Sequence, residues 1–397
     1  MLKFPLIGDL ETTVKNIGEG SIGGMKSSPF WRDNYIVAHG LKLGEERTKT
    51  WWMESPDYTK ILNRTEVLVA HNMQFDLKYW LRFHGDAFTP WLAQGGRLWC
   101  TMLAEYLLSG MTSQFPSLND TCVKYGGELK DESIKEYWDS GVGTEDIPYE
   151  QLLPYLETDV ENTYKIYLGQ VEKAKQLGMY ELLLMHMESL IAIIVMEYNG
   201  LKFDLEYARK EIKRLTAEAE ETNGSIIEYM KTVFEEPVWH KLSVDSKDQL
   251  SVMLFGGEYS YTTQEPILNK DGEPTYYSSK AAKAGEQRFK SVIKTLGTNG
   301  LGATPKPTWE LKKKGIFCTD EEVLKTVYNE CPRTQDFISK VMKGRTINKD
   351  LGTYFLGYSK LVFEDGFIHH SLNTVITSTG RLSSSSPNMQ NLSGKGD

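Results

Sequence analysis

Three segments of the sequence carry pairs of polar residues whose spacing could bring acidic side chains together. The pairs are Asp9 and Glu11, Asn72 and Asp76, and Tyr155 and Asp159. The first two residues stand two positions apart at the end of an apolar run, and on a strand such side chains share one face. The members of the other pairs are four residues apart, so on a helix each pair shares a face. One such pair is common on solvated loops, but three in this order favour a common site.

Four carboxylates brought together would repel one another, and at least one would have a raised pKa unless cations were bound. Oxygen ligands alone suit Mg²⁺ or Mn²⁺ rather than zinc or copper. Two such ions about 4 Å apart stabilise the attacking and the leaving oxygen in phosphodiester cleavage, and one of them lowers the pKa of a bound water. Tyr155 could orient that water through its phenol. We assign it positioning rather than proton abstraction, because a phenol of ordinary pKa is a poor base.

Hydrophobic periodicity predicts the elements that must position these residues. Apolar runs bounded by polar residues predict short strands, and helical spacing predicts helices. The expected strands are at about 4–9, 35–43, 47–53 and 67–71, and the expected helices are near 73–83, 99–109 and 149–174. This arrangement predicts an α/β domain over residues 1–178.

The pattern changes after about residue 180. From there to about 234 the spacing is helical, with a break at Asn199-Gly200 and a second helix from Asp204, a residue that suits an N-cap. Another helix is expected from about residue 319. The last thirty residues are strand-like and then loop-like.

Composition limits the class of protein. With 397 residues, 40% hydrophobic and 25% charged, the chain is long enough for two or three globular domains. The four cysteines show no CxxC spacing, which disfavours a zinc site or a disulfide framework. The longest apolar run, 190–196, is too short to cross a bilayer, and the N-terminus has no signal-peptide pattern. We expect a soluble protein of the cytoplasm, of the host cell if the source is viral, with no membrane partner.

Charge is distributed unevenly. The net charge of −9 argues against a chain that coats DNA indiscriminately, but residues 270–314 hold ten basic and four acidic side chains, interleaved with aromatic ones. The surrounding segment, about 256–315, is expected to be a loop or a small insertion. It is either a solvated loop, a DNA grip or a dock for a processivity factor.

Three motifs resemble those of the DEDDy 3′→5′ proofreading exonucleases. They are Asp-Leu-Glu-Thr at 9–12, Asn-Met-Gln-Phe-Asp at 72–76 and Tyr-Leu-Glu-Thr-Asp at 155–159, and the resemblance spans about residues 4–175. It implies an RNase H-like fold that binds two metal ions, Mg²⁺ or Mn²⁺. The implied metal ligands are Asp9, Glu11, Asp76 and Asp159.

The same resemblance implies how the substrate is held. Tyr155 is the water-orienting residue, and Thr12 and Asn72 contact the terminal nucleotide. Lys15 stands where the bacterial family usually carries an apolar residue that wedges the terminal base. This contact with the substrate therefore departs from the family.

Residues 377–391 combine hydroxyl side chains with a glycine, an arginine and several amides, which suits contacts with the DNA backbone and minor groove. A disordered serine-rich tail is the alternative. In the order and identity of its residues, the segment resembles the start of the palm in family A DNA polymerases. The residues before it resemble the thumb that leads to the palm, and together the resemblance covers most of 185–391. The implied primer–template contacts are Arg381, Asn388, Gln390 and Asn391.

These resemblances predict an α/β RNase H-like exonuclease domain (1–178), a mostly α-helical polymerase thumb (179–370) and a short β palm start (371–397). The palm aspartates and the fingers helix of the family match no segment of this sequence, so the chain is not expected to polymerise by itself. We interpret it as one subunit of a split phage-type polymerase whose second polypeptide carries palm and fingers. An unpaired sheet edge in a divided palm favours a tight partner. A truncated chain or a frameshift is the alternative.

The expected function is a two-metal 3′→5′ exonuclease that acts on single-stranded DNA 3′ ends, releases nucleoside monophosphates and proofreads for this polymerase, whose primer–template it also grips. One alternative is a non-catalytic DNA-binding or assembly subunit with a vestigial site. The other is a stand-alone nuclease for RNA ends or host DNA.

Overall fold

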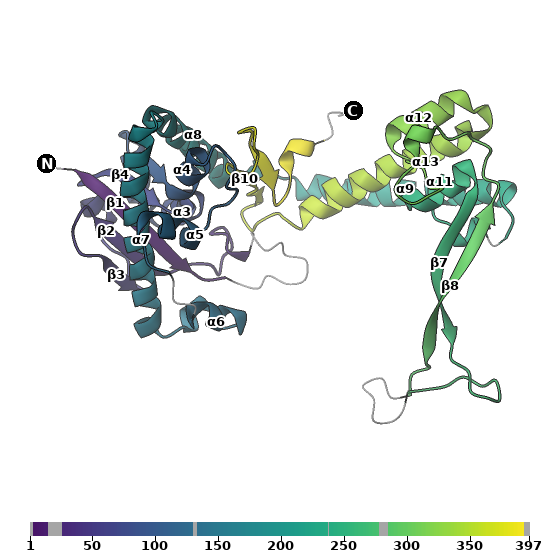
Figure 1. Ribbon diagram of the computed structural model, residues 1–397, viewed down its shortest axis with the longest axis horizontal. Coiled ribbons are helices and arrows are strands. Elements are labelled where there is room, and N and C mark those ends of the chain that lie inside the picture. Colours follow the sequence, from purple (N-terminus) through teal and green to yellow (C-terminus); the bar gives the residue numbers. More distant parts are fainter. Residues whose placement is uncertain (1–2, 15–25, 130–132, 237, 278–284, 393–397) are drawn as a thin grey trace. The chain divides into compact units, whose positions relative to one another are not determined.

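The computed structural model describes residues 3–14, 26–129, 133–236, 238–277 and 285–392, so Lys15 lies outside the described residues (Figure 1). By packing, the chain divides into two compact units. Unit 1 comprises Met1–Leu205 with Tyr358–Asp397, and unit 2 comprises Glu206–Gly357. Unit 2 is thus inserted into the sequence of unit 1.

Unit 1 is built on a five-stranded sheet of order β3-β2-β1-β4-β5. The central β1 (Phe4–Thr12) pairs antiparallel with β2 (Ile36–Leu43) and parallel with β4 (Thr65–Ala70). The outer strands are β3 (Lys49–Trp52) and β5 (Arg97–Cys100). Four of these strands lie where the sequence predicts them, and β5 was not predicted.

Helices cover both faces of this sheet. Consecutive residues of a strand point to opposite faces. Gly8 lies against Trp80 of one helix, while the next residue, Asp9, is in register with Gly40, which lies against Leu156 of another. The helices of unit 1 are α2 (Tyr58–Leu62), α3 (Met73–Ala93), α4 (Thr101–Leu108), α5 (Leu118–Cys122), α6 (Ser133–Asp139), α7 (Tyr149–Gln176) and α8 (Tyr180–Asn199), with 3₁₀ turns η1 (Val123–Tyr125) and η2 (Thr144–Asp146). Therefore α3 and α7 pack on opposite faces.

Unit 1 also contains the last described part of the chain. Its strands form two short antiparallel pairs: β9 (Phe367–Ile368) pairs with β6 (Leu201–Lys202), and β10 (Ser371–Asn373) pairs with β11 (Ser383–Ser385). A 3₁₀ turn, η6 (Met389–Asn391), follows. The described part of the serine-rich segment therefore includes a paired strand, which contradicts the alternative of a disordered tail.

The compact units do not coincide with the ranges predicted for the domains. Residues 179–205 and 358–370, which were expected in the thumb, pack with unit 1. The reason is the apolar face of α8, which is buried in the same core as the sheet. Its buried side chains are Leu183, Met187, Leu190 and Ile194.

Unit 2 is mostly helical and has its own core. Phe337, Ile338, Leu250 and Met253 are fully buried in it. Its helices are α9 (Leu205–Val233), which begins at the unit boundary, α10 (Val238–Lys241), α11 (Lys247–Phe255), α12 (Glu321–Glu330) and α13 (Gln335–Lys349), with 3₁₀ turns η3 (Pro307–Trp309) and η4 (Pro332–Thr334) and a π-helix η5 (Asp350–Gly357). As predicted, a break at Asn199-Gly200 separates α8 from the long helix that follows.

The segment predicted as a loop or small insertion contains a two-stranded ribbon. β7 (Gly257–Pro266) and β8 (Phe289–Thr298) pair antiparallel over ten residue pairs, and Figure 1 shows them running out from the helices of unit 2. Most of their side chains are exposed. The loop interpretation is wrong for these twenty residues.

None of the helices within the described ranges is both long enough and apolar enough to cross a membrane.

Candidate metal centre

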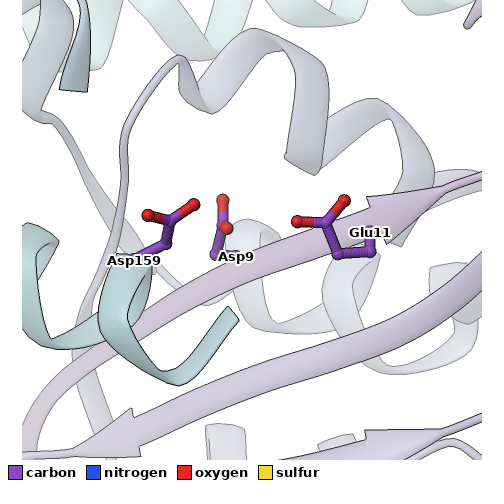
Figure 2. A group of neighbouring side chains, drawn as sticks. All are labelled: Asp9, Glu11 and Asp159. Atoms are coloured by element: carbon purple, nitrogen blue, oxygen red, sulfur yellow. The ribbon is translucent and has the colours of Figure 1, made fainter. Parts of the chain in front are cut away.

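Three carboxylates meet on the sheet of unit 1. Asp9, Glu11 and Asp159 each offer one oxygen, and these oxygens lie within 4.8 Å of one another (Figure 2). As the sequence predicts, Asp9 and Glu11 come from one face of β1, and Asp159 comes from α7. A set of carboxylate oxygens at this spacing fits a hard divalent cation such as Mg²⁺ or Mn²⁺.

Asp76 lies in the first turn of α3, close enough to Asp9 and Glu11 to interact with their charges, although it is not one of the three carboxylates that converge. Its side chain is buried, and its Oδ1 has no hydrogen-bond partner among the described residues. Burial raises the pKa of Asp76 well above its ordinary value, and repulsion from Asp9 and Glu11 raises it further. A bound cation would remove both effects, so the orphaned oxygen supports the fit of a metal to this donor set.

The turn that leads into α3 differs from the prediction. Asn72 was expected on the helix, on one face with Asp76. Instead it is the N-cap, with left-handed backbone angles of φ 60° and ψ 50°, and the helix begins at Met73. Asparagine tolerates this conformation better than most residues. Asn72 lies at the N-terminus of α3, and its side chain is exposed.

Tyr155 lies one helical turn before Asp159 on α7, as predicted, and is half-buried. Its ring packs edge-on against Trp138, with ring centroids 6.0 Å apart. Burial and this contact orient the tyrosine, which suits a positioning role.

A hollow of about 430 Å³ lies at the end of β1, and Glu11 and Thr12 both line it. Most of its other walls are apolar or glycine. They are Leu10, Val14, Phe75, Trp138, Gly141, Val142 and Gly143, with Ser27 and Thr144. Among these, the segment around Trp138 was missed by the sequence reasoning, because nothing in its local pattern relates it to the acidic motifs.

The residues predicted to contact the primer–template form a separate set on the last described segment. Arg381, Asn388, Gln390 and Asn391 are all exposed. Asn388 caps η6 by accepting from the Gln390 backbone N–H at 3.1 Å, and Gln390 Nε2 donates to the Leu382 carbonyl at 3.2 Å. These contacts hold the segment in a defined conformation.

The meeting of β1 and α7 depends on a small residue that the sequence reasoning also missed. Gly40 of β2 is in register with Asp9. A Cβ atom at Gly40 would lie 2.8 Å from Leu156 Cγ and 2.9 Å from Val160 Cγ2, and both of these side chains are fully buried in α7. Glycine thus lets the helix that carries Asp159 approach the strand beside Asp9.

We therefore expect Gly40→Ala to push α7 away from the sheet. It should destabilise unit 1 by about 1–3 kcal/mol, the usual range for overpacking, and weaken divalent-metal binding. Urea unfolding and Mn²⁺ titration measure the two effects. The matched control is Gly224→Ala on α9, where no atom lies within 4 Å of the added Cβ. This change should raise the free energy of unfolding by about 0.5–1 kcal/mol. Unchanged stability in Gly40→Ala would contradict the packing argument.

Two families match the sequence. Residues 9–169 match the 3′-5′ exonuclease family, and residues 292–397 match DNA polymerase family A. The first range contains every residue of the acidic site, and the second contains β9 to β11.

Individual proteins give the same result. The chain is 24% identical to the DNA polymerase of Bacillus phage SP01 over 341 residues, which is 83% of this chain and 34% of that protein. It is 26% identical to DNA polymerase I of Synechocystis over 332 residues, which is 82% of this chain and 27% of that protein. The chain thus spans about a third of the length of these relatives, or less.

Among solved structures, the polymerase domain of Pol1 from M. smegmatis, in complex with DNA primer-template and dNTP, is similar in fold. The TM-score is 0.62 at 15% identity, and the match covers 100% of this chain and 53% of the other. Taken with the acidic site, these matches support a 3′-5′ exonuclease domain over residues 9–169 and a segment related to family A DNA polymerases over residues 292–397.

Proposed function

We propose that the chain is a metal-dependent 3′→5′ exonuclease that removes nucleotides from DNA 3′ ends and proofreads for a DNA polymerase. One observation carries this proposal. The carboxylates of Asp9, Glu11 and Asp159 converge within 4.8 Å, inside a domain that matches the 3′-5′ exonuclease family.

The residues have distinct roles in this proposal. Two divalent cations, held by Asp9, Glu11, Asp76 and Asp159, would supply the charge stabilisation that phosphodiester cleavage requires. Tyr155 orients the attacking water through its phenol.

Substrate recognition is assigned to the neighbouring hollow. It receives the terminal nucleotide, whose base contacts the apolar walls of Phe75 and Trp138. Thr12 lines the same hollow and contacts the sugar, and Asn72, exposed at the start of α3, contacts the same nucleotide.

The direct test uses a 5′-labelled single-stranded oligonucleotide. With Mg²⁺ the chain should shorten it stepwise from the 3′ end and release nucleoside monophosphates, and EDTA should stop the reaction. An oligonucleotide whose last linkages are phosphorothioates is the control and should resist digestion. Failure of the metal-loaded wild type to shorten the unmodified strand would refute the proposal. DNA binding that persists without cleavage would then favour a non-catalytic subunit, and a preference for RNA ends would favour a stand-alone nuclease.

The polymerase-family segment extends the proposal to primer–template binding. We assign unit 2 to the thumb and residues 371–397 to the start of the palm, with Arg381, Asn388, Gln390 and Asn391 as DNA contacts. Polymerisation would require a second polypeptide that carries palm and fingers. Phe289, at the far end of the ribbon of β7 and β8, and Tyr276, in the segment between the two strands, are both exposed, which suits contact with DNA or with a processivity factor.

A further inference from the structure

Two polar residues of α3 lie on the side of this helix that is opposite to Asp76. Gln74 and Lys78 each lie two positions from Asp76, about 200° around the helix axis, and four positions from each other. They therefore share a face of α3 that points away from Asp76.

Both residues contact one buried carboxylate. Lys78 Nζ lies 2.9 Å from Glu197 Oε2, and Gln74 Nε2 donates to Glu197 Oε1 at 3.2 Å. Glu197 belongs to α8, and its side chain is 2% exposed. If one of these contacts were lost, a buried polar or charged group would remain without a partner, which is costly. These contacts therefore fix α3 more firmly than a surface ion pair would.

The same carboxylate also binds the polymerase-family segment. The Leu372 N–H in β10 donates to Glu197 Oε1 at 2.5 Å. Gln74 completes the arrangement, because its Nε2 donates to the Leu372 carbonyl at 2.9 Å and its Oε1 accepts from Thr374 Oγ1 at 3.3 Å. The helix behind Asp76 is thus joined to β10 through Glu197 and Gln74.

We propose that Glu197 is a positioning residue for the metal centre. Through its contacts with Gln74 and Lys78, it fixes the position of α3 and thereby the distance of Asp76 from Asp9 and Glu11. Because it also binds β10, this distance depends on the position of β10. Mg²⁺ demands near-ideal octahedral geometry, so a small displacement of one carboxylate changes metal binding. The effect on digestion rests on the proposed exonuclease function, whereas the effect on metal binding does not.

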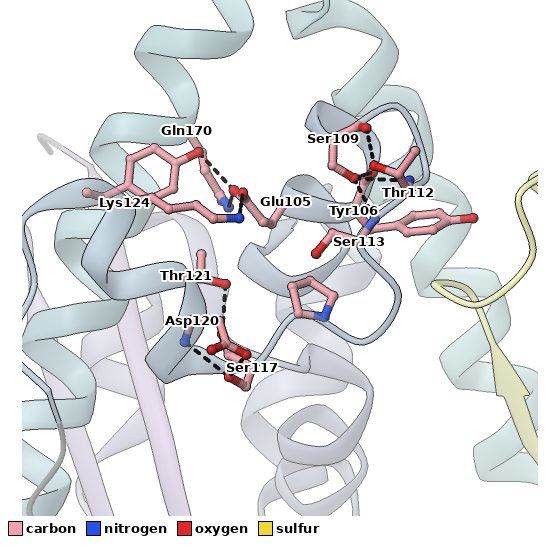
Figure 3. Close-up of polar contacts among 12 residues, drawn as sticks. Glu105, Tyr106, Ser109, Thr112, Ser113, Ser117, Asp120, Thr121, Lys124 and Gln170 are labelled. Carbon is pink, nitrogen blue, oxygen red and sulfur yellow. Dashed lines mark hydrogen bonds and ion pairs between the residues drawn. The ribbon is translucent and has the colours of Figure 1, made fainter.

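The test compares two buried glutamates in the full chain. Glu105 of α4 also has a side chain that is 2% exposed, and it pairs with Lys124 at 2.9 Å and with Tyr125 at 2.8 Å (Figure 3 shows its contacts with Lys124 and Gln170). Glu105→Gln is therefore a matched control for Glu197→Gln. It removes an equally buried charge from unit 1 at a position outside the proposed site.

Mn²⁺ binding by calorimetry and digestion of a single-stranded oligonucleotide give separate readouts. Glu197→Gln should weaken Mn²⁺ binding about tenfold and slow digestion about 10- to 100-fold, the range for residues that orient metal ligands. Glu105→Gln should leave Mn²⁺ affinity unchanged even if it lowers the melting temperature. Hydrogen exchange should also quicken at 73–78 and 371–374 in Glu197→Gln, because these segments share the lost contact.

Two results would overturn the inference. One is a folded Glu197→Gln chain with wild-type Mn²⁺ affinity. The other is an equal loss of affinity in Glu105→Gln, which would mean that any buried charge matters. If Glu197→Gln does not fold, Gln74→Leu, which keeps the charge pair but loses the contacts to β10, must show the same weakening. A wild type that binds Mn²⁺ but leaves DNA intact would end the exonuclease proposal and leave the metal-binding comparison decisive for Glu197.

Discussion

Asp159→Asn is expected to lower the rate of 3′-end digestion by about three orders of magnitude, which corresponds to about 4 kcal/mol of transition-state stabilisation. Asparagine keeps the volume of the side chain but removes its charge. Asp159 supplies one of the three oxygens that lie within 4.8 Å, and it does so from α7, whereas the other two come from β1. Without its charge, α7 contributes no carboxylate to this group of three, so we expect the binding of a divalent cation between the two elements to be lost.

Single-turnover digestion at saturating Mg²⁺ measures this effect. The control is Glu157→Gln, which makes the same change of acid to amide on the same helix. Glu157 lies two positions before Asp159 and is not one of the three carboxylates that converge. This variant should digest at the wild-type rate. An Asp159→Asn chain that retained more than about a tenth of the wild-type rate would show that the group is not the reaction centre.

Asp76→Asn should stabilise the metal-free chain. Without metal, at pH 7, it is expected to raise the free energy of unfolding by about 1–3 kcal/mol, because it replaces a carboxyl group whose ionisation is opposed by burial and by two neighbouring carboxylates. It should also reduce the gain from Mg²⁺, which for a site filled at a hundred times its Kd is about 2.7 kcal/mol in the wild type.

The sign of the pH dependence follows from the direction of the pKa shift. The pKa of Asp76 is higher in the folded than in the unfolded chain, so its stabilising contribution is complete below the unfolded value and is lost as the pH rises through the folded one. In EDTA the wild type should therefore lose stability over that interval, and Asp76→Asn should lose less.

Urea unfolding in EDTA and in Mg²⁺, at several pH values, tests this prediction. Asp86→Asn is the control, because Asp86 is exposed on the same helix; its change should stay within about 0.5 kcal/mol. An Asp76→Asn chain that is less stable than the wild type in EDTA at pH 7, or equal stabilisation of both chains by Mg²⁺, would contradict the prediction.

Most of the sheet and the three acids that converge could be predicted from the sequence. Apolar runs marked β1, β2 and β4, because these strands place buried side chains in the core, and β3, whose half-buried Trp51 packs against that core. The motif around Asp159 was placed on a helix because apolar residues recur around it at helical spacing. The sequence pattern was sufficient for elements whose formation depends on residues that are close together in the sequence.

Features that depend on distant contacts were not predicted. β5 (Arg97–Cys100) was not predicted, because its last two residues were included in the helix expected near 99–109. The ribbon of β7 and β8 is exposed on most of its surface, so its residues carry little of the hydrophobic alternation that marks a half-buried strand. The tight contact at Gly40 and the carboxylate of Glu197 depend on partners more than 100 residues away.

The insertion of unit 2 into unit 1 has a consequence for synthesis on the ribosome. Glu197 is translated long before Leu372, and the whole of Glu206–Gly357 emerges between them. While unit 2 is translated, the first part of unit 1 therefore remains incomplete, and the Glu197 carboxylate still lacks the Leu372 N–H as a donor. Such waiting intermediates expose apolar surface, so chaperones become relevant to the yield of this protein.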